Sequence, residues 1–100
     1  YARQKYGDMR VAVVDTDCHH GDGTEDIYWN DPDTLFISLH QDGRTLYPGT
    51  GPVEDLGGPS AFGYNVNIPL PPNTGDEGFQ YHLRCHLLEA GIGGPTCRFR

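Results

Sequence analysis

The sequence predicts an α/β fold with a mainly parallel sheet. Two short runs rich in strand-forming apolar residues carry this prediction, at residues 10–15 and 34–40. The 18 residues between them are enough for the crossover connection that two parallel strands require. The first run is continuously apolar, which is typical of a strand covered on both faces. We therefore expect it to be buried between layers of helices.

A long loop and a third strand follow the second run. Residues 41–60 are rich in glycine and proline and poor in apolar residues, which indicates a loop of a length that is often functional. Residues 63–69 alternate at a period of two, so that Tyr64, Val66 and Ile68 share one face. The asparagines between them occupy the other face. We expect a partly exposed strand.

Three helical segments complete the expected elements. Residues 1–7 are typical of the end of a helix that has already begun. Residues 24–29 indicate a short helix that Thr24 caps, with acidic residues in its first turn. Residues 74–77 have capping-box spacing, and apolar residues then recur at intervals of four. These features predict a longer amphipathic helix that ends at Gly91.

Composition excludes several classes of function. The chain has 100 residues with seven basic and 14 acidic side chains, and its net charge of −7 is accompanied by no basic cluster. We therefore expect no direct nucleic-acid partner. No apolar run approaches the ~18 residues that cross a bilayer, and the first residues contain no signal-peptide apolar region. These features predict a cytoplasmic protein that does not bind membranes.

The number and spacing of the cysteines do not indicate a disulfide framework. Cys18, Cys85 and Cys97 are odd in number and include no C-x-x-C pair, so a disulfide framework is not expected. Each is expected to be a small buried hydrophobe.

Polar side chains follow the first strand directly, in the segment Asp-Thr-Asp-Cys-His-His-Gly-Asp-Gly-Thr at residues 15–24. Ligands of open α/β sheets bind beyond the carboxyl ends of the strands. If the chain stays extended, Asp15, Asp17 and His19 project to one side with neighbours about 6.5–7 Å apart. Asp17 and His19 are then the better pair for Zn²⁺ or a similar ion, and at least one ligand must come from elsewhere. The alternative is that the aspartates cap the next turn and the histidines are loop residues.

These residues resemble the histone deacetylase superfamily, which includes acetylpolyamine amidohydrolases and acetoin-utilisation proteins. The combination of D-x-D-x-H-H-G-D-G-T with S-L-H and P-G-T-G is highly specific. The matching segments are residues 11–24, 35–40, 46–51 and 63–70. The resemblance implies a fragment of the three-layer α/β/α arginase/deacetylase-like fold. Residues 1–100 would be the central portion of one such domain, incomplete at both ends, and residues 85–100 depart from the family pattern.

The resemblance implies two neighbouring cation sites. Asp17 and His19 would be two of the three protein ligands of a catalytic zinc, with Fe²⁺ as the alternative metal. Asp15, Ser38 and the carbonyl of Leu39 would help to hold a monovalent cation, K⁺ or Na⁺, beside it. A peripheral third site is implied at Tyr28, Asp31, Thr34 and Tyr64.

The resemblance also implies roles around the metal. Tyr47 would wall the substrate channel, and His20 and Asp22 would support the metal ligands from behind or shape their loop. The base histidines would lie upstream of residue 1, and the third zinc ligand and the oxyanion tyrosine downstream of residue 100. No catalytic acid or base is therefore expected within the chain.

The implied activity is zinc-dependent hydrolysis of an acetyl amide by metal-activated water. The substrate would be an acetylated lysine peptide or an acetylated polyamine, and nothing predicts the oligomeric state. Two alternatives stay open. One is a non-catalytic truncated or scaffold module of the same fold. The other is an arginase-like ureohydrolase with two manganese ions, which would require an aspartate where Gly21 stands.

Overall fold

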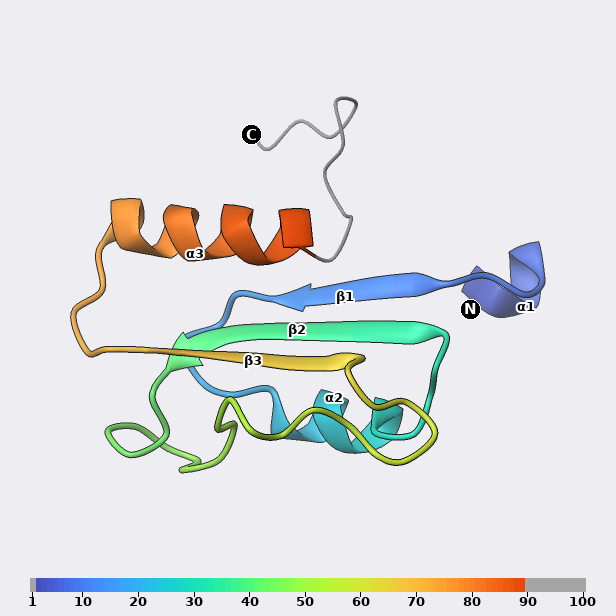
Figure 1. The fold of residues 1–100 in the computed structure, drawn as a ribbon, viewed down its shortest axis with the longest axis horizontal. Helices are drawn as coiled ribbons and strands as arrows, with labels where there is room; N and C mark the ends of the chain where they lie inside the picture. The colour runs from blue at the N-terminus through green and yellow to red at the C-terminus, as the bar shows by residue number, and fades with distance from the viewer. Residues whose placement is uncertain (1, 90–100) are drawn as a thin grey trace.

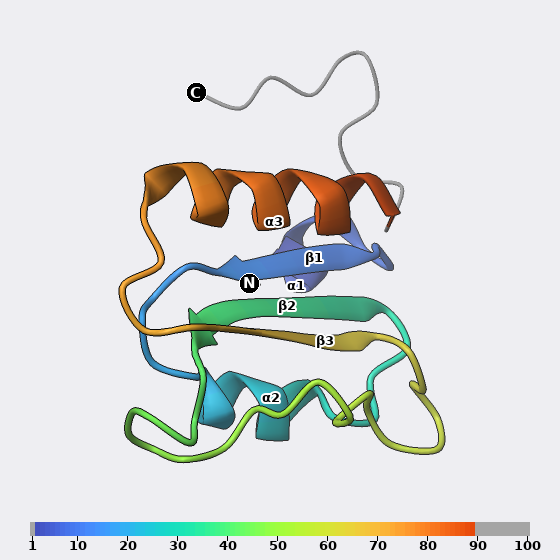
Figure 2. The ribbon, with the colours of Figure 1, turned by 60° about the vertical axis from the view of Figure 1, so that its left-hand side comes forward.

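The computed structural model describes residues 2–89, which form three helices and three parallel strands. They are α1 (Ala2–Tyr6), β1 (Val11–Asp15), α2 (Asp22–Tyr28), β2 (Thr34–Gln41), β3 (Asn65–Leu70) and α3 (Asp76–Glu89). The strand order is β1-β2-β3, and the sheet lies between α3 and α2 (Figure 1). Figure 2 shows the same three layers after rotation. The predicted α/β class and parallel sheet are confirmed.

The register of the strands sets the two faces of the sheet. Asp15 of β1 pairs with Ser38 of β2, and Ser38 pairs with Asn67 of β3. Because paired residues of neighbouring strands point to the same side, these three polar side chains form one row across the sheet. The row lies on the face that α2 covers, since the Asn67 amide contacts Glu25 of α2.

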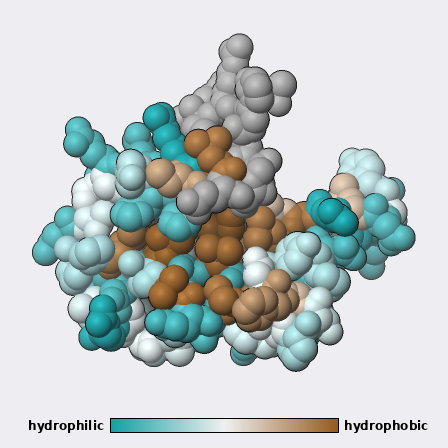
Figure 3. Space-filling model, in the orientation of Figure 1, coloured by the Kyte–Doolittle hydropathy of each residue, from teal (hydrophilic) through white to brown (hydrophobic). Residues whose placement is uncertain are grey.

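The apolar core lies on the opposite face, between the sheet and α3. Its buried members are Ile37, Leu39, Ile68, Leu70 and Leu87. The apolar residues at intervals of four in α3 all pack here, as predicted from their spacing. Figure 3 shows a band of apolar residues along the strands below α3.

Two helix starts differ from prediction. Helix α2 begins at Asp22 after Gly21, so Thr24 lies inside the helix and does not cap it. Helix α3 begins at Asp76, and the Thr74 hydroxyl donates to the carbonyl of Pro71 at 2.6 Å instead of completing a capping box. A nearby carbonyl in the turn competes for this hydroxyl. The predicted end at Gly91 lies outside the described residues.

The prediction that the first strand is buried on both faces is wrong. β1 is an edge strand of this sheet, and its side chains alternate between half-buried and exposed. Helix α3 packs over β2 and β3. The face of β1 that carries Val14 therefore lacks a cover among residues 2–89, and this side chain is 37% exposed.

The third strand has the predicted apolar face, since Val66 and Ile68 pack in the core, but the expectation that the strand is partly exposed is wrong. Asn65 and Asn67 are buried, whereas Tyr64, which was placed on the apolar face, is 40% exposed. The reason is that α2 covers the asparagine face and brings the carboxylate of Glu25 against both amides. Buried amides are tolerated when they find such partners.

Two further expectations concern the surface. Cys18 is exposed rather than buried, and Cys85 is half-buried. Both thiols are free, and Cys97 lies outside the described residues. Within residues 2–89, no helix is long and apolar enough to cross a membrane.

The adjacent leucines of α3 provide a test of the core. Leu87 is 3% exposed and Leu88 is 61% exposed. We predict that Leu87→Ala lowers the free energy of unfolding by about 2–5 kcal/mol, because it leaves a cavity against the sheet. Leu88→Ala, the matched control, should change it by less than about 0.5 kcal/mol. Urea unfolding measures both, and equal losses would contradict the packing of α3.

Candidate metal centre

Two aspartate side chains shape the loop after β1. The Asp15 Oδ1 atom accepts a hydrogen bond from the backbone N–H of Asp17 at 3.0 Å. The Asp17 Oδ1 atom accepts one from the backbone N–H of His19 at 2.8 Å. Each bond closes a local turn, so the chain does not stay extended after the strand. The predicted spacing along an extended chain therefore does not apply.

The turns bring the side chains of Asp17 and His19 together. The Asp17 Oδ1 and His19 Nδ1 atoms lie 3.1 Å apart, and both residues are exposed. Hydrogen bonds from the backbone and then the ring of His19 lower the pKa of Asp17, so the carboxylate is available as an anion. Cys18 offers a third ligand atom, since these three residues place their donors within 4.8 Å of one another. The sequence analysis did not consider Cys18 as a ligand.

Asp15 is the last residue of β1, and it pairs in register with Ser38 inside β2. Ser38 is fully buried, and Asp15 is half-buried beside it in the register. The loop returns closely over Asp15: a Cβ atom on Gly21 would lie 2.4 Å from Asp15 Oδ2 and 3.0 Å from Phe36 Cζ. The side chain of Leu39 packs in the apolar core, so only its backbone can face the polar row.

Tyr47 borders the pair from the long loop. Its ring centroid lies 6.4 Å from that of His19 in an edge-to-face arrangement, and its side chain is 81% exposed. Asp22 opens α2 and accepts a hydrogen bond from the backbone N–H of Gly23. Asp17, His19 and Tyr47 are thus brought to one exposed place, whereas the Asp22 carboxylate binds the backbone of its own turn.

His20 points into the protein, unlike His19. Its Nε2 atom donates to Glu25 Oε2 at 3.0 Å, and its Nδ1 atom lies 2.7 Å from Thr50 Oγ1. The same Glu25 oxygen accepts from the amides of Asn65 and Asn67 at 2.8 Å each. This buried carboxylate was not predicted from the sequence, where Glu25 is typical of an acidic residue in a first helical turn.

A second buried histidine, His40, joins β2 to the long loop. Its Nε2 atom lies 2.9 Å from the carbonyl oxygen of Gly51, and its Nδ1 atom 2.9 Å from Ser38 Oγ. The rings of His20 and His40 lie 4.8 Å apart. Burial is the main cause that lowers the pKa of His40. His20 and His40 thus bind Thr50 and Gly51, two neighbouring residues of the long loop.

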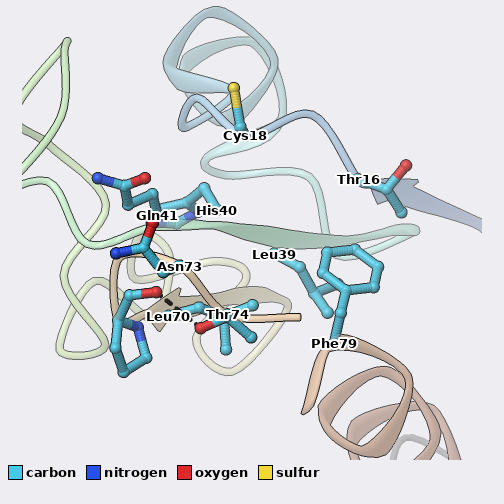
Figure 4. A pocket seen from close by; sticks show the side chains of 10 residues that line it. Thr16, Cys18, Leu39, His40, Gln41, Leu70, Asn73, Thr74 and Phe79 are labelled. Carbon is cyan, nitrogen blue, oxygen red and sulfur yellow. Dashed lines mark hydrogen bonds between the residues drawn. The ribbon is translucent and has the colours of Figure 1, made fainter. Parts of the chain in front are cut away.

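A pocket of about 160 Å³ opens at the carboxyl ends of the strands (Figure 4). Cys18 lies on one side of it and Phe79 of α3 on the other, with Leu39 and His40 between them. The residues that line it include neither Asp17 nor His19. The pocket therefore adjoins the loop of the metal pair without containing the pair.

The implied peripheral cation site holds a side-chain cation. The Arg3 guanidinium donates to Asp31 Oδ2 and to Thr34 Oγ1, each at 2.7 Å. The Arg3 side chain is the main cause that lowers the pKa of Asp31. Arg3 thus binds the side-chain oxygens of Asp31 and Thr34 in this structure.

Comparison with known proteins gives a consistent result. The family model described as the histone deacetylase domain matches residues 1–91. A probable deacetylase of Archaeoglobus fulgidus is 57% identical over 75 residues, which are 75% of this chain and 20% of that protein.

Solved structures agree with the sequence relatives. An acetylpolyamine aminohydrolase from Burkholderia pseudomallei superposes with a TM-score of 0.77 at 37% identity, over 82% of this chain and 24% of that one. An HDAC homolog from Aquifex aeolicus gives a TM-score of 0.79 at 29% identity, over 92% and 26%. The chain thus spans about a fifth to a quarter of the length of these relatives.

The close approach at Gly21 can be tested with a neighbouring glycine. We predict that Gly21→Ala destabilises the protein by about 1–3 kcal/mol, because its Cβ must displace Asp15 or Phe36. Nothing lies within 4 Å of a Cβ on Gly23, in the same helix. Gly23→Ala should therefore be neutral or stabilise by up to about 1 kcal/mol. Thermal unfolding compares the two, and a neutral Gly21→Ala would refute the contact.

Proposed function

The chain belongs to the histone deacetylase family, and from that premise we propose that the protein is a zinc-dependent amidohydrolase. It removes acetyl groups from lysine side chains or polyamines. The observation that carries the proposal is the meeting of the Asp17 carboxylate and the His19 imidazole at 3.1 Å, beside the exposed ring of Tyr47. The relatives named as a deacetylase and an acetylpolyamine aminohydrolase support the reaction class.

The two side chains fit a zinc ion. Ligands about 2.0–2.2 Å from a tetrahedral zinc lie about 3.3–3.6 Å apart, close to the observed separation. The pair therefore needs little movement to chelate the metal. The proton shared by Asp17 Oδ1 and His19 Nδ1 would have to be released for both atoms to bind it. A third protein ligand is needed to complete such a zinc site. A zinc ion bound there supplies a Lewis acid that polarises the acetyl carbonyl and acidifies water.

Other residues of the chain act around that metal. Asp15, Ser38 and the carbonyl of Leu39 offer oxygen ligands of the kind that K⁺ or Na⁺ prefers. Asn67 Oδ1, at the other end of the same row, is buried and has no hydrogen-bond partner among residues 2–89. An acceptor without a donor favours a bound water or cation near the row. Tyr47 packs its ring along the aliphatic part of the substrate.

Charge favours a cationic substrate. The net charge of −7 attracts basic peptides and polyamines alike, so it supports the substrate class without separating its two members.

The arginase-like alternative is disfavoured by a contact. Two manganese ions would require a carboxylate at position 21, where even a Cβ atom would meet Asp15 Oδ2 at 2.4 Å. The loop therefore has no room for a third acidic ligand in this conformation. One catalytic metal fits better than two.

We predict that Asp17→Ala and His19→Ala each lower zinc content and deacetylation together in the full protein, because each removes a ligand. Loss of a supporting residue behind a ligand costs about 10- to 100-fold, so loss of the ligand itself should cost at least about 100-fold. Zinc is measured by elemental analysis, and activity on an acetyl-lysine peptide and an acetylpolyamine.

Asp26→Ala is the matched control, because Asp26 is an exposed acidic residue of α2 outside the site. It should keep both zinc and activity. Full zinc content in both ligand variants would refute the assignment. Full zinc without turnover of either substrate in the wild-type protein would favour the non-catalytic alternative.

A further inference from the structure

Three side chains that bind transition metals lie close together on helix α3. They are His82, Cys85 and His86. Residues three and four apart in a helix are neighbours, with Cβ atoms about 5–6 Å apart, so His82 borders both of the others. All three residues are half-buried, and the Cys85 thiol is free. None of them belongs to the candidate metal centre in the loop after β1.

The two histidines leave the helix on the same side. Their rings stack, with centroids 6.3 Å apart and planes inclined by 17°. Two histidines four residues apart on one helix face are a spacing that chelates zinc. The backbone of α3 therefore already provides the spacing that the metal needs. Rotation of the side chains between staggered rotamers brings their ring nitrogens to one ion, and the helix does not have to move.

Cys85 adds a sulfur ligand, and the resulting set of donors favours zinc. Imidazole nitrogen and thiolate sulfur are the ligands that zinc binds in tetrahedral protein sites. Mg²⁺ and Ca²⁺ prefer oxygen ligands, so they fit this set poorly. Three protein ligands leave one position of the tetrahedron, which a water molecule can take. The three side chains therefore select a transition metal of the zinc type.

The position of these residues in the helix also favours a cation. His86 belongs to the last turn of α3. The carbonyl groups at the carboxyl end of a helix carry a partial negative charge, which stabilises positive charge in the last turn. The chain as a whole has a net charge of −7, which attracts cations to its surface. Local and overall charge thus act in the same direction.

We propose that His82, Cys85 and His86 form a second zinc site, which clamps the last two turns of α3. An ion held by residues of successive turns keeps those turns helical. Leu87, which packs against the sheet, lies in the same stretch of the helix. Zinc therefore stabilises the docking of α3 and takes no part in the reaction. The site is separate from Asp17 and His19 and does not rest on the proposed function.

Three substitutions separate metal binding from ring packing. Ring packing is the competing explanation, because His82 also contacts Tyr81, whose ring centroid lies 5.5 Å away. His82→Phe keeps an aromatic ring between Tyr81 and His86 and removes the nitrogen ligand. Cys85→Ser replaces the sulfur with an oxygen, which is a poorer ligand for zinc. Arg84→Ala is the matched control, because Arg84 is exposed and residues two apart on a helix do not face each other.

The measurement is the zinc content of the full protein, by elemental analysis after dialysis against a series of buffered zinc concentrations. Loss of a group behind a metal ligand already costs about 10- to 100-fold in affinity. We therefore expect His82→Phe and Cys85→Ser each to weaken one zinc ion at least about tenfold, whereas Arg84→Ala stays within about twofold. Zinc should also raise the unfolding midpoint less in His82→Phe than in the wild type. Deacetylation should be unchanged in all three variants.

Several outcomes would overturn the inference. Equal zinc affinity in wild type and His82→Phe would leave ring packing as the explanation of the stacked histidines. Unchanged affinity in Cys85→Ser would exclude the sulfur ligand, and with it the site as proposed. Equal weakening in Arg84→Ala and His82→Phe would indicate an effect on helix stability instead of a lost ligand. If His82→Phe does not fold, His82→Gln decides in the same titration.

Discussion

The buried carboxylate of Glu25 is the group on which the arrangement of the polar face depends. One oxygen of Glu25 accepts hydrogen bonds from His20, Asn65 and Asn67, which belong to the loop after β1 and to β3. Burial of a carboxylate costs several kcal/mol unless donors replace its water. The three donors must therefore converge on α2 together. This requirement fixes the path of the loop after β1. It therefore also fixes the position of His19.

The two faces of the sheet are stabilised by different interactions, because the two helices that cover them contribute different kinds of side chain. On the α3 side, leucine and isoleucine side chains exclude water and stabilise the layer. On the α2 side, Phe36 is buried among polar strand residues that include serine, histidine and asparagine, and their hydrogen bonds replace much of that apolar contact. Hydrogen bonds have preferred directions, whereas apolar packing has few, so the polar face specifies orientation. The cation-binding groups proposed above lie on that face, beside the end of the first strand.

The sequence was sufficient to predict the helices and strands. It was not sufficient to predict which groups contact each side chain. Apolar runs and crossover length predicted the parallel strands, because these features are local. The burial of Asn65 could not be predicted, since it depends on which face α2 covers. The partner of the Thr74 hydroxyl depended on a turn carbonyl that spacing does not reveal. Asp17 and His19 were predicted as a pair from an extended chain, but local turns bring them together. The two side chains therefore meet through a geometry other than the expected one, and their role as metal ligands stays a prediction.

The adjacent histidines couple the exposed pair to the interior. His19 points outward to Asp17, and His20 points inward to Glu25 and Thr50, so consecutive residues face opposite ways across one short bend. A shift of the His19 backbone would move His20 as well and stretch hydrogen bonds in a place that water does not reach. Buried hydrogen bonds that lose a partner cost more than exposed ones. The position of the exposed imidazole is thus held by hydrogen bonds that a ligand at the surface never touches.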